Sequence, residues 1–423
     1  MPTLAINGGT PITSEPFPSQ LDLDFSAMEK IMETVLSNEL LTGYQANAAN
    51  FYGGPCIKAL ERAFEKMFGS GSAIACNSCT SALQIACMAI GLEPGDEVIV
   101  SPYSMTCSAT APLICGATPV FADVEKDYYC LDPASIEKVI TDKTKAIIVV
   151  DLFGQPHDVD HIKAIAKKHG LFIIEDAAQA IGSKCYKKYA GTFGDIGCFS
   201  FNQGKHISVG EGGMIVTDND ELAVKCRLLM NHAESVINEW NDVDNVNLNL
   251  LDEIKHMWGF NMRMTEITAA IALNQLEQFE YHMDRRMMNV RYLNGALSEI
   301  PAITPSPIRP FCTHTHYVQS FTWDDQFGIH RDKFINAVKA ELMPISGRES
   351  EGVPIGNGYI KPLYRFPIFE DNSKYHYDRF PVVEKLWKDD LFLMRFHAPP
   401  TEIKHAKLVS DAFFKVWEYR SEL

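Results

Sequence analysis

A single lysine, Lys205, stands between an aromatic-serine-aromatic stretch and a glycine cluster in the segment FSFNQGKHISVGEGG, residues 199–213. A Gly-Lys pair occurs in phosphate-binding P-loops, but that motif has a glycine five residues before the pair and a Ser or Thr after it. Phe199 and His206 occupy those positions, so the P-loop interpretation fails. Two interpretations remain: a Schiff-base lysine that holds a carbonyl cofactor, and an ordinary surface lysine in a turn.

A lysine-bound cofactor would make further demands, and pyridoxal phosphate is the common cofactor of this kind. Its pyridine nitrogen needs a carboxylate, and Asp176 ends a buried-looking strand. Its phosphate needs hydroxyls and the backbone N–H groups of a helix N-terminus, which residues 78–81 and Ser200 could offer. Taken singly, Asp176, Thr80 and Ser81 are each more simply interpreted as helix caps.

The elements that would position these groups alternate between short β-branched runs and helical patterns from about residue 70 to 230. The runs IIVV (147–150) and FII (172–174) predict strands buried on both faces, and apolar residues three to four apart over 157–170 predict a helix between them. This alternation predicts an α/β fold with a mostly parallel sheet covered by helices on both faces. Ligands of such sheets bind beyond the carboxyl ends of the strands, where residues 77–81, 176–179 and 200–205 fall.

The pattern changes in the second half of the chain. Residues 245–264 are polar and irregular, which predicts a loop, and residues 265–297 have one long helical period. Prolines become frequent from about residue 300, where short strands mix with helices. We expect an N-terminal arm over residues 1–29, a large cofactor-binding domain over 30–285, and a small α+β domain over 286–423.

The net charge and composition limit the kinds of molecule that this protein is expected to bind. The formal net charge of −16 and the lack of a Lys/Arg run argue against nucleic acid or an anionic membrane surface. No apolar run approaches the roughly 20 residues that span a bilayer, and the start of the sequence does not look like a signal peptide, so we expect a cytoplasmic protein. The 11 cysteines then suggest reduced thiols, and the pair Cys76 and Cys79 lacks a second half for a zinc site. We expect no metal.

Two histidine pairs have spacings that could carry chemistry. His157 and His161 are four residues apart, as zinc ligands can be, but Asp158 beside them favours a helix cap. His314 and His316 alternate as on a strand. They could line a substrate entrance or lie on the surface.

Residues 175–220, from EDAAQAIG to VTDND, strongly resemble the pyridoxal-phosphate-dependent sugar aminotransferases of the DegT/DnrJ/StrS family. The resemblance continues through residues 92–124, 144–162 and 259–279, and it covers about residues 30 to 280 in order. The LAINGGTP start and the forms FNQGK and MRMTE look most like the branch that acts on keto-cyclitols (inososes) and includes aminohydroxybenzoate synthases. The resemblance implies fold type I, the aspartate-aminotransferase fold with a seven-stranded sheet, and a homodimer with active sites at the subunit interface.

The resemblance also implies roles for individual residues. Lys205 matches the lysine that holds the cofactor, and Asp176 matches the partner of the pyridine nitrogen. Gln179 matches the residue near the ring oxygen. These three residues would surround the reactive part of pyridoxal phosphate.

Other matches concern the cofactor phosphate and the ring face. Cys79 and Thr80 match the phosphate-binding turn, Ser200 matches the phosphate-binding serine, and Asn261 matches an asparagine that reaches the phosphate from the neighbouring subunit. At position 107 the family usually has an aromatic residue that stacks on the ring, and this chain has Cys107. A cysteine can pack on a ring through its sulfur with less area, or Tyr103 could shift in to stack.

The resemblance implies an aminotransferase that moves an amino group from glutamate or glutamine to a keto-sugar or keto-cyclitol. Such a reaction would belong to amino-sugar, antibiotic or cell-surface polysaccharide biosynthesis. One alternative is a sugar dehydratase that uses the aminated cofactor, although relatives with that activity can have a histidine in place of the lysine. The other is a regulatory homologue without turnover, which would usually lack Lys205 or Asp176.

Overall fold

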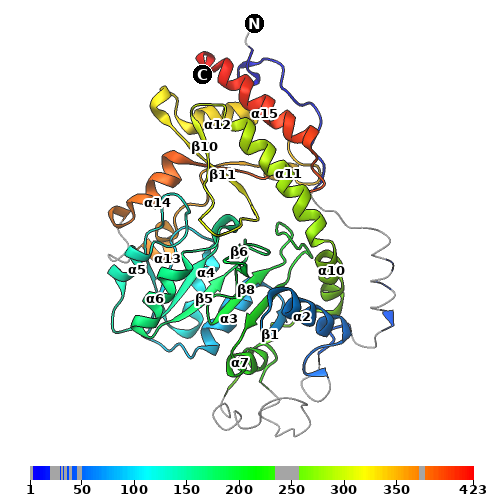
Figure 1. Ribbon diagram of the computed structural model, residues 1–423, viewed down its shortest axis with the longest axis vertical. Helices are drawn as coiled ribbons and strands as arrows, with labels where there is room; N and C mark the ends of the chain where they lie inside the picture. The colour runs from blue at the N-terminus through cyan, green and yellow to red at the C-terminus, as the bar shows by residue number, and fades with distance from the viewer. Residues whose placement is uncertain are drawn as a thin grey trace.

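The computed structural model describes residues 3–19, 41–44, 50–233, 257–370 and 377–423, with a few isolated positions between 29 and 37. The part of the expected loop at residues 245–256 lies outside the described residues. Figure 1 shows two sheets, a large one in the lower half and a smaller one near the chain termini.

The large sheet has seven strands in the order β1-β9-β8-β5-β4-β2-β3. Only β9 runs antiparallel to its neighbours, so the predicted α/β fold with a mostly parallel sheet is confirmed. The strands are β1 (Ser72–Cys76), β2 (Glu97–Val100), β3 (Thr118–Phe121), β4 (Thr144–Val150), β5 (Phe172–Asp176), β8 (Ile196–Ser200) and β9 (Gly213–Thr217).

Strand β4 shows why the apolar runs form the centre of this sheet. Successive side chains of a strand point to opposite faces. Ile148 and Val150 join the larger hydrophobic core, whereas Ile147 and Val149 join a core on the other face. Helices cover both faces: α2 (Pro55–Phe68), α3 (Cys79–Ala89), α4 (Thr106–Thr110), α5 (Pro133–Val139), α6 (Val159–His169) and α7 (Asp220–Met230).

The C-terminal part contains a four-stranded antiparallel sheet in the order β10-β11-β13-β12. It has its own hydrophobic core, which also takes in Leu4 and Phe17 from the N-terminal stretch. Its elements are β10 (Ile303–Pro305), β11 (Gln319–Trp323), α12 (Arg331–Ala340), β12 (Ile355–Asn357), α13 (Pro367–Glu370), α14 (Pro381–Lys385), β13 (Leu391–Met394) and α15 (Ile403–Glu418). A two-stranded hairpin, β6 (Lys184–Cys185) and β7 (Lys188–Tyr189), projects from the large sheet region.

The long helical pattern over 265–297 is two helices, α10 (Glu266–Glu277) and α11 (Phe279–Leu297), which meet at Gln278. Phe279 of α11 packs in the large core, and Leu293 packs in the C-terminal core, so α11 connects the two. The expected boundary between residues 285 and 286 falls within α11, and the domain limits stay a prediction. None of the helices in the described ranges has the length and apolarity to cross a membrane.

Candidate active site

Strand register brings the expected phosphate-binding residues together. Gly213 of β9 pairs with Cys76 of β1 on one side and with Ser200 of β8 on the other. Helix α3 begins at Cys79, directly after β1. The ends of strands far apart in sequence therefore bring Ser200 close to the N-terminus of a helix.

The N-terminus of α3 has the features of an anion-binding site. Ser78 is the N-cap, and its hydroxyl accepts a hydrogen bond from the Ser81 N–H at 3.1 Å. The cap is thus Ser78, and neither Thr80 nor Ser81 takes that role. The N–H groups of Cys79 and Thr80 have no acceptor within the helix, because they lie in its first turn. Such N–H groups and the helix dipole favour a phosphate at this position.

Gly213 allows this close approach. A Cβ at Gly213 would lie 2.5 Å from the Ser78 carbonyl carbon and 2.7 Å from the Cys79 nitrogen, both of them backbone atoms. A side chain would push β9 away from the start of α3. The bare backbone of Gly213 therefore keeps the anion-binding turn in place.

We expect Gly213→Ala to weaken cofactor binding and to lower the thermal unfolding midpoint. Overpacking of this kind costs about 1–3 kcal/mol, and the strain falls on the turn that would hold the phosphate. Titration of the cofactor-free protein with pyridoxal phosphate measures the first effect, and thermal unfolding measures the second. Gly295→Ala on α11, where a Cβ would have nothing within 4 Å, is the control: it should leave cofactor binding unchanged and should raise the unfolding midpoint slightly, because alanine favours a helix over glycine by about 0.5–1 kcal/mol.

Asp176, the last residue of β5, presents a buried carboxylate held from two sides. The Ser108 hydroxyl donates to Oδ2 at 2.7 Å, and the Ala178 N–H donates to Oδ1 at 3.3 Å. Burial raises the pKa of the Asp176 carboxyl, whereas the Ser108 hydrogen bond and the nearby Lys205 ammonium lower it. The carboxylate is oriented before any ligand arrives.

Gln179 follows at the same edge of the sheet and is also fixed. Its Oε1 accepts a hydrogen bond from the Phe153 N–H at 2.9 Å, and its Nε2 donates to the Tyr359 hydroxyl at 3.1 Å. The sequence did not suggest Tyr359, which comes from the C-terminal part of the chain. A ring oxygen near Gln179 would therefore also lie near this tyrosine.

Lys205 is half-buried and does not lie on an open surface turn. Its Nζ lies 4.1 Å from the centroid of the Tyr317 ring. Cys79 Sγ at the start of α3 lies 3.9 Å from Asp176 Oδ1, and Asp176 pairs with Cys198 of β8, the strand that leads into the Lys205 segment. Lys205 is thus partly enclosed by the protein, and its role as the cofactor lysine stays a prediction.

A comparison with known protein families matches residues 38–406 to the DegT/DnrJ/EryC1/StrS aminotransferase family. The chain belongs to this family. Its members are aminotransferases that depend on pyridoxal phosphate.

Two relatives and one solved structure show how close the similarity is. GDP-perosamine synthase of Escherichia coli O157:H7 is 40% identical over 79% of this chain and 84% of its own length. A putative L-glutamine:3-amino-2,3-dideoxy-scyllo-inosose aminotransferase of Streptoalloteichus tenebrarius is 31% identical over 94% of this chain and 89% of its own. The crystal structure of DesI with its TDP-sugar product has a TM-score of 0.82 and 26% identity, and it covers 99% of this chain and 97% of that one.

The residues present fit the family cofactor. The backbone of Gly213 lies close against the α3 N-terminus, and the Cys79 and Thr80 N–H groups there have no helical acceptor. The buried Asp176 carboxylate lies 3.9 Å from Cys79 Sγ at the same helix N-terminus. Phosphate, ring nitrogen and carbonyl would each find a suitable partner.

Position 107, where the family pattern has an aromatic residue, holds a partly buried cysteine. Cys107 lies in the first turn of α4, and burial and the Asp176 carboxylate raise its thiol pKa to about 11. Cys107 is therefore a neutral thiol at neutral pH. Tyr103 is completely buried, and its hydroxyl accepts a hydrogen bond from the Tyr359 N–H at 2.9 Å, so that contact holds it in the core.

The remaining sequence candidates lie in different surroundings. Asn261 is exposed beside Asn231, with which it forms a β-bridge, so a neighbouring subunit could reach it. His314 and His316 are both buried, with ring centroids 3.9 Å apart, so the surface interpretation of this pair is wrong. Asp158 caps α6, as expected.

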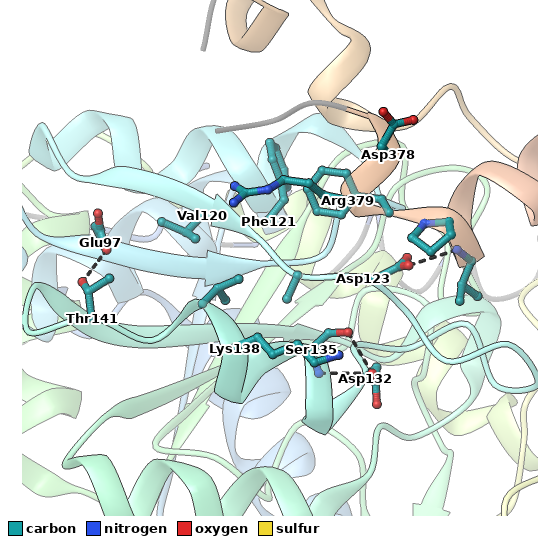
Figure 2. Close-up of a pocket in the computed structure, with 15 residues that line it drawn as sticks. Glu97, Val120, Phe121, Asp123, Asp132, Ser135, Lys138, Thr141, Asp378 and Arg379 are labelled. Atoms are coloured by element: carbon teal, nitrogen blue, oxygen red, sulfur yellow. Dashed lines mark hydrogen bonds between the residues drawn. The ribbon is translucent and has the colours of Figure 1, made fainter. Parts of the chain in front are cut away.

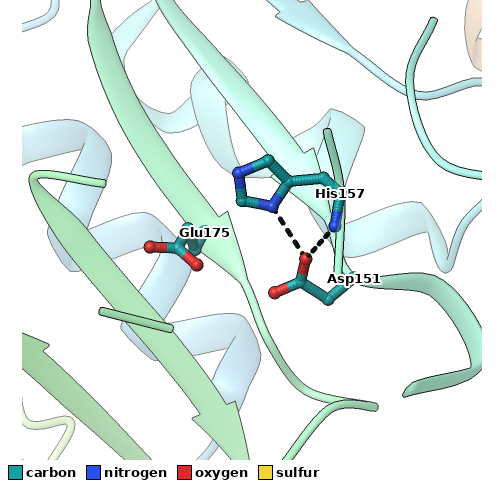
Figure 3. A group of neighbouring side chains, drawn as sticks. All are labelled: Asp151, His157 and Glu175. Atoms are coloured by element: carbon teal, nitrogen blue, oxygen red, sulfur yellow. Dashed lines mark hydrogen bonds and ion pairs between the residues drawn. The ribbon is translucent and has the colours of Figure 1, made fainter. Parts of the chain in front are cut away.

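His157 belongs to a separate buried group, in which Asp151 directly follows β4, His157 lies just before α6 and Glu175 is on β5. Its ring Nδ1 and its backbone N–H both lie within 2.9 Å of Asp151 Oδ1 (Figure 3). Glu175 lies close by and accepts hydrogen bonds from the N–H groups of Gly191 and Gly194. Because Glu175 immediately precedes Asp176, this group anchors the strand end that carries the active-site carboxylate.

We expect Glu175→Gln to destabilise the protein in a pH-dependent way. Burial and the Asp151 carboxylate raise the pKa of Glu175 from 4.5 to about 7, while His157 and two backbone N–H groups act in the opposite sense. The folded state therefore holds this proton more tightly, so the stability it contributes is complete below pH 4.5 and is lost as the pH rises through 7. Glutamine does not titrate, so the difference in unfolding midpoint should be largest near pH 5 and smallest near pH 8. A difference that stays constant over this range would contradict the shift.

A cavity of about 770 Å³ lies at the other edge of the sheet (Figure 2). Phe121 of β3, Lys138 of α5 and Arg379 of the C-terminal part contribute to its wall. None of the residues that surround Lys205 lines it. Its size alone therefore does not make it the aminotransferase site.

Proposed function

We propose that this protein transfers an amino group from glutamate or glutamine to a keto-sugar or keto-cyclitol. The observation that carries the proposal is the convergence of Lys205, the buried Asp176 carboxylate and the open N-terminus of α3 at one edge of the sheet. Family membership supplies the reaction class. The names of the relatives supply the acceptor class, since one is a perosamine synthase and another is an inosose aminotransferase.

In this proposal each side chain binds one part of pyridoxal phosphate. The Cys79 and Thr80 N–H groups and the Ser200 hydroxyl bind the phosphate, helped by Asn261 of a second copy of the chain in a homodimer. Lys205 Nζ forms the covalent link.

The ring would be held from three directions. Asp176 pairs with the ring nitrogen, Gln179 lies near the ring oxygen, and Cys107 packs on the ring face. The hydrogen bond from Ser108 fixes Asp176 for this pairing.

The protein's own groups then account for the proton transfers. Bound pyridoxal phosphate supplies an electron sink for the negative charge that develops at the donor carbon. Lys205 Nζ would hold the cofactor carbonyl in the resting protein and, as a free amine, would move the proton of the donor carbon. The same amine works in reverse when the acceptor carbonyl is aminated. Asp176 keeps the ring nitrogen protonated through both halves.

The name of one further relative supports a wider setting for the proposed reaction. Spore coat polysaccharide biosynthesis protein SpsC of Bacillus subtilis is also similar, at 33% identity over 80% of this chain and 84% of its own length. We place the reaction in amino-sugar, antibiotic or cell-surface polysaccharide biosynthesis, in the cytoplasm.

An absorbance titration tests the donor half of the proposal. The visible band of the lysine-bound cofactor should give way to the band of the aminated cofactor when L-glutamate or L-glutamine is added. A screen of nucleotide-linked keto-sugars and keto-cyclitols, which should restore the first band, then identifies the acceptor. No spectral change with either amino acid would contradict the proposed donors, and restoration by neither acceptor class would contradict the proposed acceptor.

A further inference from the structure

A small cavity of about 50 Å³ opens beside Lys205, and its wall is positively charged. Lys205 and Arg286 line it together with His206 and His282, and no carboxylate is among its lining residues. This is unusual in a chain with a net charge of −16. About 10–15 Å³ suffices for one water, so the cavity has room for a group of a few atoms and is too small for a sugar ring.

Arg286 is the most informative residue of this wall. It is on α11, only 8% exposed, and no Asp or Glu of the described chain lies within ion-pair distance of it. A buried guanidinium without an acidic partner is costly, because burial removes its hydration. Burial lowers the pKa of Arg286 to about 10, and this value still leaves it charged at neutral pH.

The hydrogen bonds of Arg286 leave part of the guanidinium available. Nη1 donates to the His316 carbonyl oxygen at 2.9 Å and lies 3.0 Å from His397 Nε2. Among the residues that the structure places, Nε and Nη2 have no partner. Nη1 of the guanidinium thus holds Arg286 in position, and the edge formed by Nε and Nη2 is left for a ligand.

The neighbouring histidines add no negative charge to the cavity. Burial and the Arg286 charge lower the pKa values of His206, His316 and His397, so all three are neutral at physiological pH. Several of their ring nitrogens have no hydrogen-bond partner. The group surrounding Arg286 is therefore polar but uncharged, and the missing counter-charge has to come from a bound molecule.

We infer that Arg286 binds the α-carboxylate of the amino donor. This inference rests on the proposed aminotransferase function and deepens it. The α-carboxylate is attached to the carbon on which Lys205 acts, and Lys205 and Arg286 line the same small cavity. A guanidinium matches a carboxylate with two parallel N–H···O bonds. The phosphate group of a nucleotide-linked acceptor is the competing source of negative charge.

Single-turnover absorbance measurements on the cofactor-loaded protein test the inference. Arg286→Gln should raise the concentration of L-glutamate and of L-glutamine needed for half-maximal conversion by about 10- to 100-fold. Arg286→Lys, which keeps the charge but not the fork, should give a smaller increase. Arg285→Gln is the matched control, because Arg285 lies next to Arg286 on α11, contacts the Tyr281 hydroxyl instead and does not line the cavity.

An unreactive probe separates this inference from the proposed function. 2-Hydroxyglutarate keeps both carboxylates of glutamate but has no amine, and its binding can be followed by calorimetry. Loss of 2-hydroxyglutarate binding in Arg286→Gln supports the inference. It does so even if the wild-type protein converts neither glutamate nor glutamine, because failure to convert them would contradict only the proposed donors. Unchanged binding of the probe and of both donors in Arg286→Gln would overturn it. Weakened binding of pyrophosphate alone would also overturn it, in favour of the acceptor phosphate.

Discussion

Lys205→Ala should abolish both turnover and the visible absorbance of the lysine-bound cofactor. General base catalysis alone contributes about 10²- to 10⁴-fold, and the substitution also removes the covalent attachment. Steady-state assays with glutamate and absorbance spectra of the purified variant measure the two effects. The α3 N-terminus is untouched by the change, so the variant should still bind free cofactor.

Lys184→Ala is the matched control for this variant. Lys184 Nζ also lies over a tyrosine ring, at 4.2 Å from the Tyr189 centroid, but it belongs to the β6–β7 hairpin. It should keep wild-type turnover and spectrum. If Lys205→Ala kept both, Lys205 would not be the cofactor lysine.

Asp176→Asn should lower kcat/KM by about 10²- to 10³-fold, which is the usual effect of removing a fixed electrostatic partner. Asparagine has nearly the same shape but no negative charge, so it cannot keep the ring nitrogen protonated. The protein should still bind the cofactor through Lys205, and the absorbance spectrum checks this. Turnover above a tenth of the wild-type value would contradict the role given to Asp176.

Ser108→Ala separates the charge of Asp176 from its orientation. It removes the 2.7 Å hydrogen bond to Oδ2 but leaves the carboxylate and its hydrogen bond from Ala178. We expect a loss of roughly 10-fold, since one hydrogen bond to a charged group is worth about 1.5–3 kcal/mol, and the Ala178 contact partly compensates. A loss as large as that of Asp176→Asn would mean that orientation matters as much as charge.

The sequence predicted the large sheet because its signals are local. Runs such as 147–150 contain only apolar residues, and that pattern fits a strand covered on both faces. The resemblance to the family predicted the roles of Lys205 and Asp176. Membership of the family is confirmed, and the two roles stay predictions. The structure adds the reason that Asp176 lies beside the segment carrying Lys205, which is the parallel pairing of β5 with β8, where Asp176 pairs with Cys198.

The features that the sequence did not indicate depend on contacts between distant segments. Arg286 lies on an ordinary amphipathic helix, and Tyr317 and Tyr359 come more than 110 residues after Lys205. The division of the long helix at Gln278 has no glycine or proline to mark it. The burial of His314 and His316 depends on packing against residues such as Gly154, which local spacing cannot reveal.

The path of α11 has a mechanical consequence. A helix of this length is a stiff rod of roughly 28 Å, and about two turns separate Arg286 from Leu293, which is buried in the C-terminal core. The cavity beside Lys205 and the C-terminal sheet are therefore attached to the same rod. Any shift of the C-terminal sheet that carries α11 with it would move the Arg286 guanidinium relative to the Lys205 amine. The distance between these two groups therefore depends on the position of the C-terminal sheet relative to the large sheet.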